Sequence, residues 1–523
     1  MNESTIKKQT DNMSQASHTT EVPNEVNSSS TSSWLNRARL ISALVYILLL
    51  IGYLIFIIIC IVRYPSCEQA PSTPWWLNSI FLRFSNRTMT FNDINQKLND
   101  YQNKFSSQAL WLSPVMPLST ELNPLTWTDV DINLGGENAL VNLINKSHEN
   151  NLRILVDYPL NHLSIQSSRF PSDDLYFVWN DQGNQSNWIT IDNQQQSAWT
   201  YHNAKNSFYL HQFSKNGDAI DINYRNNRVF HDIIDSFSIW ENKFQFDGFN
   251  LQGVSYAYED FEYRNESINA KRTRHLDEDY LLLARIRSEI DSKRILLLDS
   301  IDSLSTSNDQ LLLRYYGDKK NSLGGIDIAS IEDFILNDMK SSNVTSIFHR
   351  YYHSTYFEEN RPFIWSSLSL NSKLNEAFFA ACFFHLGVIS IDIDRQGQQF
   401  TDEQLSRLRQ ISTFVRTLDV FRVGQIQQNI LSNSQILTIQ RGRRGSRHHM
   451  IIINFSNTIQ EDRIELNEGI TSAIEVLLTN KENPGLKYET NALIDMTESI
   501  RLEPYEYLII RWSPSIDRLG IIF

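Results

Sequence analysis

The segment Arg153-Ile154-Leu155-Val156-Asp157-Tyr158 is a short apolar run with two β-branched residues, closed by Pro159. Such a run is typical of a strand buried on both faces of a parallel sheet. Seven further runs share this character: Ser79–Phe84, Ala109–Val115, Phe246–Gln252, Arg294–Ser300, Gly324–Ser330, Pro362–Ser369 and Val388–Asp392. Apolar residues at three- and four-residue spacing predict helices between and after them: Glu137–Asn151, Val229–Phe244, Glu278–Asp291, Lys373–Leu386 and Glu403–Leu418. Eight strands interleaved with helices predict a (β/α)8 barrel over residues 77–423.

Two regions depart from this alternation. Residues 164–221 are polar and aromatic and are too long for a connecting loop, so they predict a small lobe inserted after the third strand. Residues 424–523 contain period-two strands separated by turns, which predict a C-terminal antiparallel β-sandwich. The predicted class is therefore α/β, a barrel with one insertion and a β-sandwich behind it.

The N-terminal region predicts a membrane anchor. Residues 1–39 are rich in Ser, Thr, Asn and Gln and predict a disordered tail. Leu40–Val62 holds 23 residues without a charge, enough for a helix of about 34 Å that crosses a bilayer. Arg37 and Arg39 precede this span and Arg63 alone follows it, a bias that places the tail in the cytosol. We expect a single-pass type II protein with a juxtamembrane neck at 63–76 and an outer C-terminal ectodomain.

Cysteine use points to a covalent partner. The chain has three cysteines: Cys60 within the span, Cys382 in an apolar stretch typical of a buried thiol, and Cys67 just outside the membrane. An odd extracellular cysteine suggests an intermolecular disulfide. A disulfide-linked homodimer and an idle thiol remain alternatives for Cys67.

Asn-x-Ser/Thr triplets beyond the span are candidate glycosylation sites: Asn86, Asn145, Asn184, Asn265 and Asn343. A sixth triplet, at Asn454, follows an apolar run and is expected to end a buried strand. The net charge of −13 lies in the ectodomain and disfavours nucleic acid or an anionic surface as partner.

Several motifs resemble the α-amylase superfamily. Ala109-Leu110-Trp111-Leu112-Ser113-Pro114 is similar to its second-strand motif, and Asp157-Tyr158-Pro159-Leu160-Asn161-His162 matches the Asp-x-x-x-Asn-His of its third strand. Asp247-Gly248-Phe249-Asn250-Leu251-Gln252 takes the place of the fourth-strand motif Asp-Gly-Phe-Arg-x-Asp. In the lobe, Ser197-Ala198-Trp199 and Phe208–Phe213 resemble the oligo-1,6-glucosidase branch.

Retaining glycoside hydrolysis needs a carboxylate nucleophile and a carboxylic acid about 5 Å away. The resemblance places these groups at positions that have changed here: Gln252 replaces the nucleophile and Asn250 the usual arginine, and the stretch around Ser369 lacks the third acid. Asp299 alone remains, in place of the usual Glu. From these departures we expect a protein that is not an enzyme and that holds no cofactor or metal.

The retained Asp157, Asn161 and His162 have two interpretations. They are hydrogen-bonded structural residues at a strand end, or they form a vestigial sugar or ion site.

The string Ile61-Val62-Arg63-Tyr64-Pro65-Ser66-Cys67, followed by Trp75-Trp76, resembles the heavy subunits of heteromeric amino-acid transporters, the cell-surface antigen heavy chain and rBAT. The resemblance implies a plasma-membrane glycoprotein that holds a multi-pass amino-acid transporter light chain through its span, its ectodomain and a disulfide at Cys67. Two alternatives stay open: a membrane-anchored α-glucosidase that uses Asp299, and a glycan-binding or adhesion receptor.

Overall fold

The chain divides into two compact units, residues 1–69 and 70–523. The computed structural model describes residues 29–63, 74–120, 122–181, 186–191, 196–214, 216–267, 271–299, 309–317, 324–330, 344–354, 361–366, 372–394, 400–431, 435–443, 446–466, 473–481 and 488–514.

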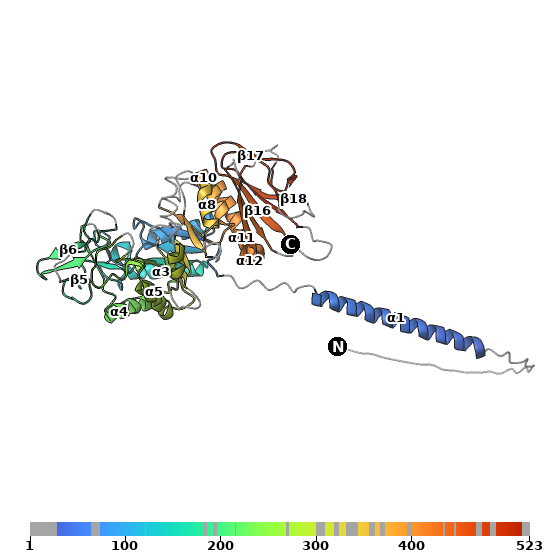
Figure 1. The fold of residues 1–523 in the computed structure, drawn as a ribbon, viewed down its shortest axis with the longest axis horizontal. Helices are drawn as coiled ribbons and strands as arrows, with labels where there is room; N and C mark the ends of the chain where they lie inside the picture. Colours follow the sequence, from blue (N-terminus) through green and yellow to red (C-terminus); the bar gives the residue numbers. More distant parts are fainter. Residues whose placement is uncertain are drawn as a thin grey trace, which may run out of the picture. The chain divides into compact units, whose positions relative to one another are not determined.

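The first unit contains one uninterrupted helix, α1 (Ser29–Arg63) (Figure 1). The helix begins at Ser29 rather than at Leu40, so the end of the predicted tail is helical. Within it, Trp34–Ile59 is long and apolar enough to cross a membrane, a test of length and composition that a signal sequence also passes. The residues from Trp34 to Ile59 are exposed, as expected of a helix whose side chains contact lipid. Residues 1–28 and the juxtamembrane string 64–73 lie outside the described residues.

The second unit is built on a closed parallel barrel with strand order β1-β13-β12-β11-β10-β9-β3-β2. The strands are β1 (Ile80–Phe84), β2 (Ala109–Leu112), β3 (Arg153–Pro159), β9 (Gly248–Gln252), β10 (Ile295–Leu298), β11 (Ile328–Ser330), β12 (Phe363–Ser366) and β13 (Gly387–Asp392). Each overlaps one of the predicted strands, and the predicted barrel is confirmed. Almost every strand side chain is buried because the strands are covered on both faces.

Helices follow the strands around the barrel: α2 (Phe91–Phe105), α3 (Gly136–Glu149), α4 (Asn227–Ser238), α5 (Asp277–Glu289), α6 (Asp309–Tyr316), α8 (Val344–Tyr352), α10 (Ser372–Cys382), α11 (Asp402–Thr417) and the short α12 (Asp419–Val423). A capping box starts α2, where the Thr90 hydroxyl accepts the Asp93 N–H and the Asp93 carboxylate accepts the Thr90 N–H. The helices named from the sequence overlap α3, α4, α5, α10 and α11, whereas α2, α6, α8 and α12 were not named.

The insertion between β3 and β9 contains two small antiparallel sheets (Figure 1). One pairs β4 (His162–Ser164) with β8 (Ala219–Asp221), and the other has the order β5 (Trp179–Asn180), β7 (Ser207–Leu210), β6 (Trp199–His202). Stacked indoles of Trp188 and Trp199, with centroids 5.5 Å apart, form part of its own apolar core. The predicted insertion is therefore a folded element with its own packing.

The C-terminal region has a six-stranded antiparallel sheet of order β14-β15-β16-β21-β18-β19 and a two-stranded sheet of β17 and β20. The bounds are β14 (Gln425–Ile430), β15 (Ile436–Gly442), β16 (His448–Asn454), β17 (Gln460–Asp462), β18 (Ile474–Thr479), β19 (Leu493–Ile494), β20 (Ile500–Leu502) and β21 (Tyr507–Trp512). Buried Glu376 of α10 joins this sheet to the barrel: it pairs with Arg407 of α11 at 2.6 Å and accepts the Tyr507 hydroxyl at 3.1 Å. Asn454 ends β16 and is fully buried, as expected for that triplet.

Candidate functional site

The carboxyl ends of the parallel strands form one mouth of the barrel, the face at which (β/α)8 proteins place their chemistry. Three strand ends bring predicted residues there: Asp157 lies near the end of β3, Asn250 and Gln252 lie at the end of β9, and Asp299 directly follows β10. Register pairs Asp157 with Asn250 across neighbouring strands. Ser369, the fourth altered position, lies outside the described residues.

Asp157 is the centre of a hydrogen-bonded cluster. It is fully buried, and its Oδ1 accepts the Trp111 Nε1–H from β2 and the Asn250 Nδ2–H from β9, both at 2.7 Å. Arg83 of β1 brings a guanidinium nitrogen to 3.8 Å from Asp157 Oδ2 and lies over the Trp111 ring at 4.5 Å. The buried carboxylate of β3 is therefore contacted by one side chain from each of three nearby strands, β1, β2 and β9.

The electrostatics of this cluster explain its composition. Burial raises the pKa of Asp157, and the charge of Arg83 together with the hydrogen bonds from Asn250 and Trp111 opposes that rise. The superfamily resemblance places an arginine at position 250, whereas here the cation comes from β1 and an amide occupies β9. Asn250 Oδ1 is buried without a hydrogen-bond partner among the described residues. In this chain the cation beside the β3 carboxylate is therefore Arg83 of β1.

Gln252 and Asp299 differ in the chemistry that their side chains allow. Both side chains are half-buried at the mouth. Gln252 offers a neutral amide, which donates and accepts hydrogen bonds, whereas glycosyl transfer chemistry requires carboxyl groups. Among the described residues, the acids at or just after barrel strand ends are Asp157, Asp299 and Asp392, the last residue of β13.

Asn161 and His162 lie where the chain leaves β3 for the lobe. The His162 ring stacks on Phe213 at 5.1 Å, and burial lowers the pKa of His162 to about 4, so it is neutral at physiological pH. The Asn161 Nδ2–H donates to the Tyr256 carbonyl, while Asn161 Oδ1 is buried without a partner among the described residues. The hydrogen bond of the amide nitrogen agrees with the structural interpretation of Asn161.

Two buried acids that the sequence analysis did not single out are Asp221, which pairs in register with His162, and Glu259 in the loop after β9. Burial, together with the charge of Glu259, raises the pKa of Asp221 to about 8 against the opposing effect of its hydrogen bonds from Gln212. Burial likewise raises the pKa of Glu259 to about 7. Asp221 adjoins Ile222, whose N–H donates to the Asn161 carbonyl at 2.9 Å.

Carboxylate and amide oxygens are the ligands that a hard divalent cation such as Ca²⁺ prefers. Both Asp221 oxygens already accept hydrogen bonds from Gln212, however, and no group of three or more His, Cys, Asp or Glu is arranged to hold a metal within the described part of the chain.

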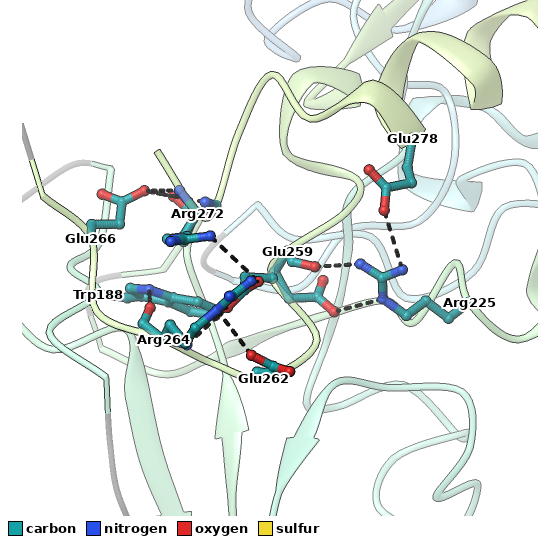
Figure 2. Close-up of polar contacts among 10 residues, drawn as sticks. Trp188, Arg225, Glu259, Glu262, Arg264, Glu266, Arg272 and Glu278 are labelled. Carbon is teal, nitrogen blue, oxygen red and sulfur yellow. Dashed lines mark hydrogen bonds and ion pairs between the residues drawn. The ribbon is translucent and has the colours of Figure 1, made fainter. Parts of the chain in front are cut away.

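Figure 2 shows the network of ion pairs and hydrogen bonds around Glu259. Arg225 lies between Glu259 and Glu278, with nitrogens 3.8 Å and 3.7 Å from their carboxylate oxygens. The Trp188 indole of the lobe donates to the Arg264 carbonyl at 3.0 Å, and the Arg264 guanidinium pairs with Glu262 at 3.1 Å. The loop after β9 is thereby attached to the inserted lobe by charge and by hydrogen bonding.

Asp247, the first residue of the fourth-strand motif, directly precedes β9 and so lies at the amino-terminal end of the barrel strands, opposite the mouth. Burial acts to raise its pKa, but hydrogen bonds from His148, the Ile154 N–H and Arg153 lower it overall. His148 Nε2 and Arg153 Nη1 each lie 2.8 Å from its oxygens, and Arg294 lies at 3.6 Å. Asp247 is therefore a structural residue that joins β3, α3 and β9.

The predicted modification sites are only partly within the described residues. Cys67, Asn184 and Asn343 lie outside them. Asn86, Asn145 and Asn265 are exposed. The serine of the Asn145 triplet, Ser147, is buried and donates to the Leu143 carbonyl at 2.8 Å. Cys382 is a buried free thiol, as its apolar sequence context predicted.

Comparison with known proteins agrees with this geometry. Residues 85–323 match the family described as "Alpha amylase, catalytic domain". Over this range the chain is similar to that family. The crystal structure of isomaltulose synthase (PalI) from Klebsiella sp. LX3 superposes with a TM-score of 0.70 over 86% of this chain and 100% of that one, at 13% identity. At that identity the likeness shows the fold alone.

The sequence relatives of this chain carry two kinds of name. "Alpha-glucosidase" of Apis mellifera is 25% identical over 256 residues, 43% of each chain. "Maltase 1" of Drosophila virilis is 25% identical over 48% of this chain and 45% of its own length. "Amino acid transporter heavy chain SLC3A1" of Mus musculus is 26% identical over 42% of this chain and 34% of its own length. The matches thus span less than half the length of these relatives.

The relatives contradict one prediction. From Asn250, Gln252 and the Ser369 region we expected a protein that is not an enzyme. Sequence relatives are named alpha-glucosidase, maltase and trehalose synthase, and these names point to an enzyme. The expectation failed because it judged activity from single positions, whereas overall similarity groups the chain with enzymes.

Proposed function

We propose that this chain is the membrane-anchored, alpha-amylase-type heavy subunit of an amino-acid transporter complex. The observation that carries the proposal is the combination of one apolar N-terminal helix, Trp34–Ile59, with an alpha-amylase-type barrel in the same chain. The similarity to the mouse transporter heavy chain supports it. In this proposal α1 packs against the helices of a multi-pass light chain, where van der Waals packing rather than the hydrophobic effect drives association. The complex resides at the plasma membrane with the barrel outside the cell.

Cys67 supplies the covalent link in this proposal. A disulfide requires Cα atoms within about 7 Å, and Cys67 follows the helix end at Arg63 by four residues. Its partner cysteine must therefore lie in a loop at the membrane surface. Such a link would hold the light chain directly beside the anchor.

The test is non-reducing electrophoresis of the tagged full chain, purified from membranes in mild detergent, with mass spectrometry of each band. We expect a band of higher mass that contains a multi-pass protein and collapses on reduction. Cys67→Ser should abolish that band, whereas the matched control Cys60→Ser, within the span, should preserve it. A band that holds only this chain would indicate the homodimer, and recovery of the chain alone from native membranes would refute the proposal.

A second candidate function, turnover of α-glucosides, is favoured by the names of the sequence relatives. The acids available at the mouth are Asp157 and Asp299, and Asp299 is the more exposed of the two. The assay is glucose release from maltose and isomaltose by the purified full chain. Turnover that Asp299→Asn abolishes and the exposed control Asp129→Asn preserves would establish this function, and it is compatible with the subunit role.

A further inference from the structure

Two histidines on the outer face of α8 lie one helical turn apart. His349 and His353 are both exposed, and their ring centroids are 4.4 Å apart. The His353 N–H donates to the His349 carbonyl at 3.1 Å, so helical geometry continues through both residues although the assigned helix ends at Tyr352. Residues at i and i+4 share one helix face.

Packing of the opposite face fixes the direction of these rings. Phe348 stacks on Trp365 and on Phe455, with centroids 6.0 Å and 5.8 Å away, and Tyr351 meets Trp365 edge-on at 5.1 Å. Because the inner face of α8 is anchored in the aromatic core, the helix cannot rotate without loss of that packing. The two imidazoles are therefore held side by side at the surface.

We propose that His349 and His353 form a two-ligand binding site for a late transition-metal ion, with Zn²⁺ as the representative. Imidazole nitrogen suits zinc, copper and nickel, and two histidines four residues apart on a helix can bind one ion through one nitrogen each. Zn–N distances of about 2.0–2.1 Å bring two coordinating nitrogens close together, which rings already in contact can reach by side-chain rotation. The remaining coordination positions are filled by water or by a side chain of a neighbouring protein.

The position along the helix also favours a cation. His353 lies at the carboxyl end of α8, where the helix carries a partial negative charge from its last carbonyl groups. The site lies on a helix between β11 and β12 and shares no residue with the barrel mouth described above.

The test is calorimetric titration of the full chain in detergent with ZnCl₂, compared among single variants. His349→Ala and His353→Ala should each lower the affinity of the same site at least about tenfold, because each removes one arm of a chelate. His231→Ala is the matched control: it removes an exposed histidine from α4, which has no second histidine within Asn227–Ser238. MgCl₂, a hard cation that prefers oxygen ligands, should give no heat that depends on either residue.

A second measurement does not depend on substitution. Zn²⁺ should protect His349 and His353 together from acylation by diethyl pyrocarbonate, read by mass spectrometry, while His231 stays reactive. Unchanged zinc affinity in both variants, or loss in only one of them, would overturn the proposal. So would equal labelling of the pair with and without zinc.

Discussion

The ion pair between Arg83 and buried Asp157 at the barrel mouth gives the sharpest prediction. Arg83→Met should destabilise the protein, because it leaves the Asp157 carboxylate without a cation. Methionine keeps much of the hydrocarbon length of arginine and removes the charge. Asp157 is fully buried and keeps only neutral donors, Trp111 and Asn250, after the change. Breaking a buried ion pair leaves an uncompensated charge, which is the costly case.

The magnitude follows from the distance. Opposite unit charges 3.8 Å apart at an effective dielectric of about 20 attract by about 4 kcal/mol. Protonation of Asp157 limits the loss, because the variant raises the pKa of a carboxyl that burial already raises. A neutral carboxyl group avoids the desolvation penalty of a buried charge. The loss in free energy of unfolding should therefore be about 3 kcal/mol at pH 7.5 and smaller at pH 5.

The assay is urea denaturation of the full chain in detergent, followed by tryptophan fluorescence at both pH values. The matched control is Arg153→Met, because Arg153 is half-exposed and its partner Asp247 keeps His148, the Ile154 N–H and Arg294. That control should lose less than about 1 kcal/mol. In the double variant Arg83→Met/Asp157→Asn, most of the loss should disappear.

Two results would refute this reasoning. One is an Arg83→Met variant within about 0.5 kcal/mol of the parent at pH 7.5, which would mean that solvent already screens the pair. The other is strict additivity in the cycle of Arg83 and Asp157, which would mean that the guanidinium acts through packing on Trp111 alone.

Three further predictions concern the frame of the barrel. The pKa of Asp221 is about 8 in the folded protein against 3.8 in the unfolded chain, so stability should fall as pH rises from 5 to 8, and Asp221→Asn should flatten that decline in thermal melts. Glu376→Gln should cost about 3 kcal/mol in urea denaturation, because it removes the charge of a buried carboxylate that pairs with Arg407 of α11 and accepts the Tyr507 hydroxyl of the C-terminal sheet. Gly253→Ala should cost about 1–2 kcal/mol by the same measurement, since residue 253 has φ of +75° and its new Cβ would lie 2.9 Å from a neighbouring Cβ.

The barrel was readable from sequence because its signal is repeated and local. Each strand is a short apolar run closed by a turn residue, and the run Arg153–Tyr158 lies within the observed β3. The differences fall at element ends: α1 begins at Ser29, and the predicted strand Ala109–Val115 ends at Leu112. Ends depend on capping and tertiary contact, which periodicity does not contain.

The site was less readable because its partners are distant in sequence. Asp157 was recognised from a motif, whereas Arg83 carries no motif and gains its role only because β1, β2, β3 and β9 are neighbours in the closed barrel. Asp221 and Glu259 are likewise ordinary acids in sequence and become unusual through burial. Charge complementarity between strands is a property of strand order.

This dependence on strand order means that the residues at the barrel mouth can differ while the barrel fold stays the same. Side chains at the carboxyl ends of adjacent parallel strands converge on a shared volume, so a cation can approach Asp157 from β1 as well as from β9. What the fold requires is that the buried carboxylate be neutralised and that its oxygens be hydrogen-bonded, from whichever strand. In this chain the neutralising charge comes from Arg83 of β1, and the hydrogen bonds come from Trp111 of β2 and Asn250 of β9. Stability of the barrel therefore places few limits on which strand supplies each contact at its mouth.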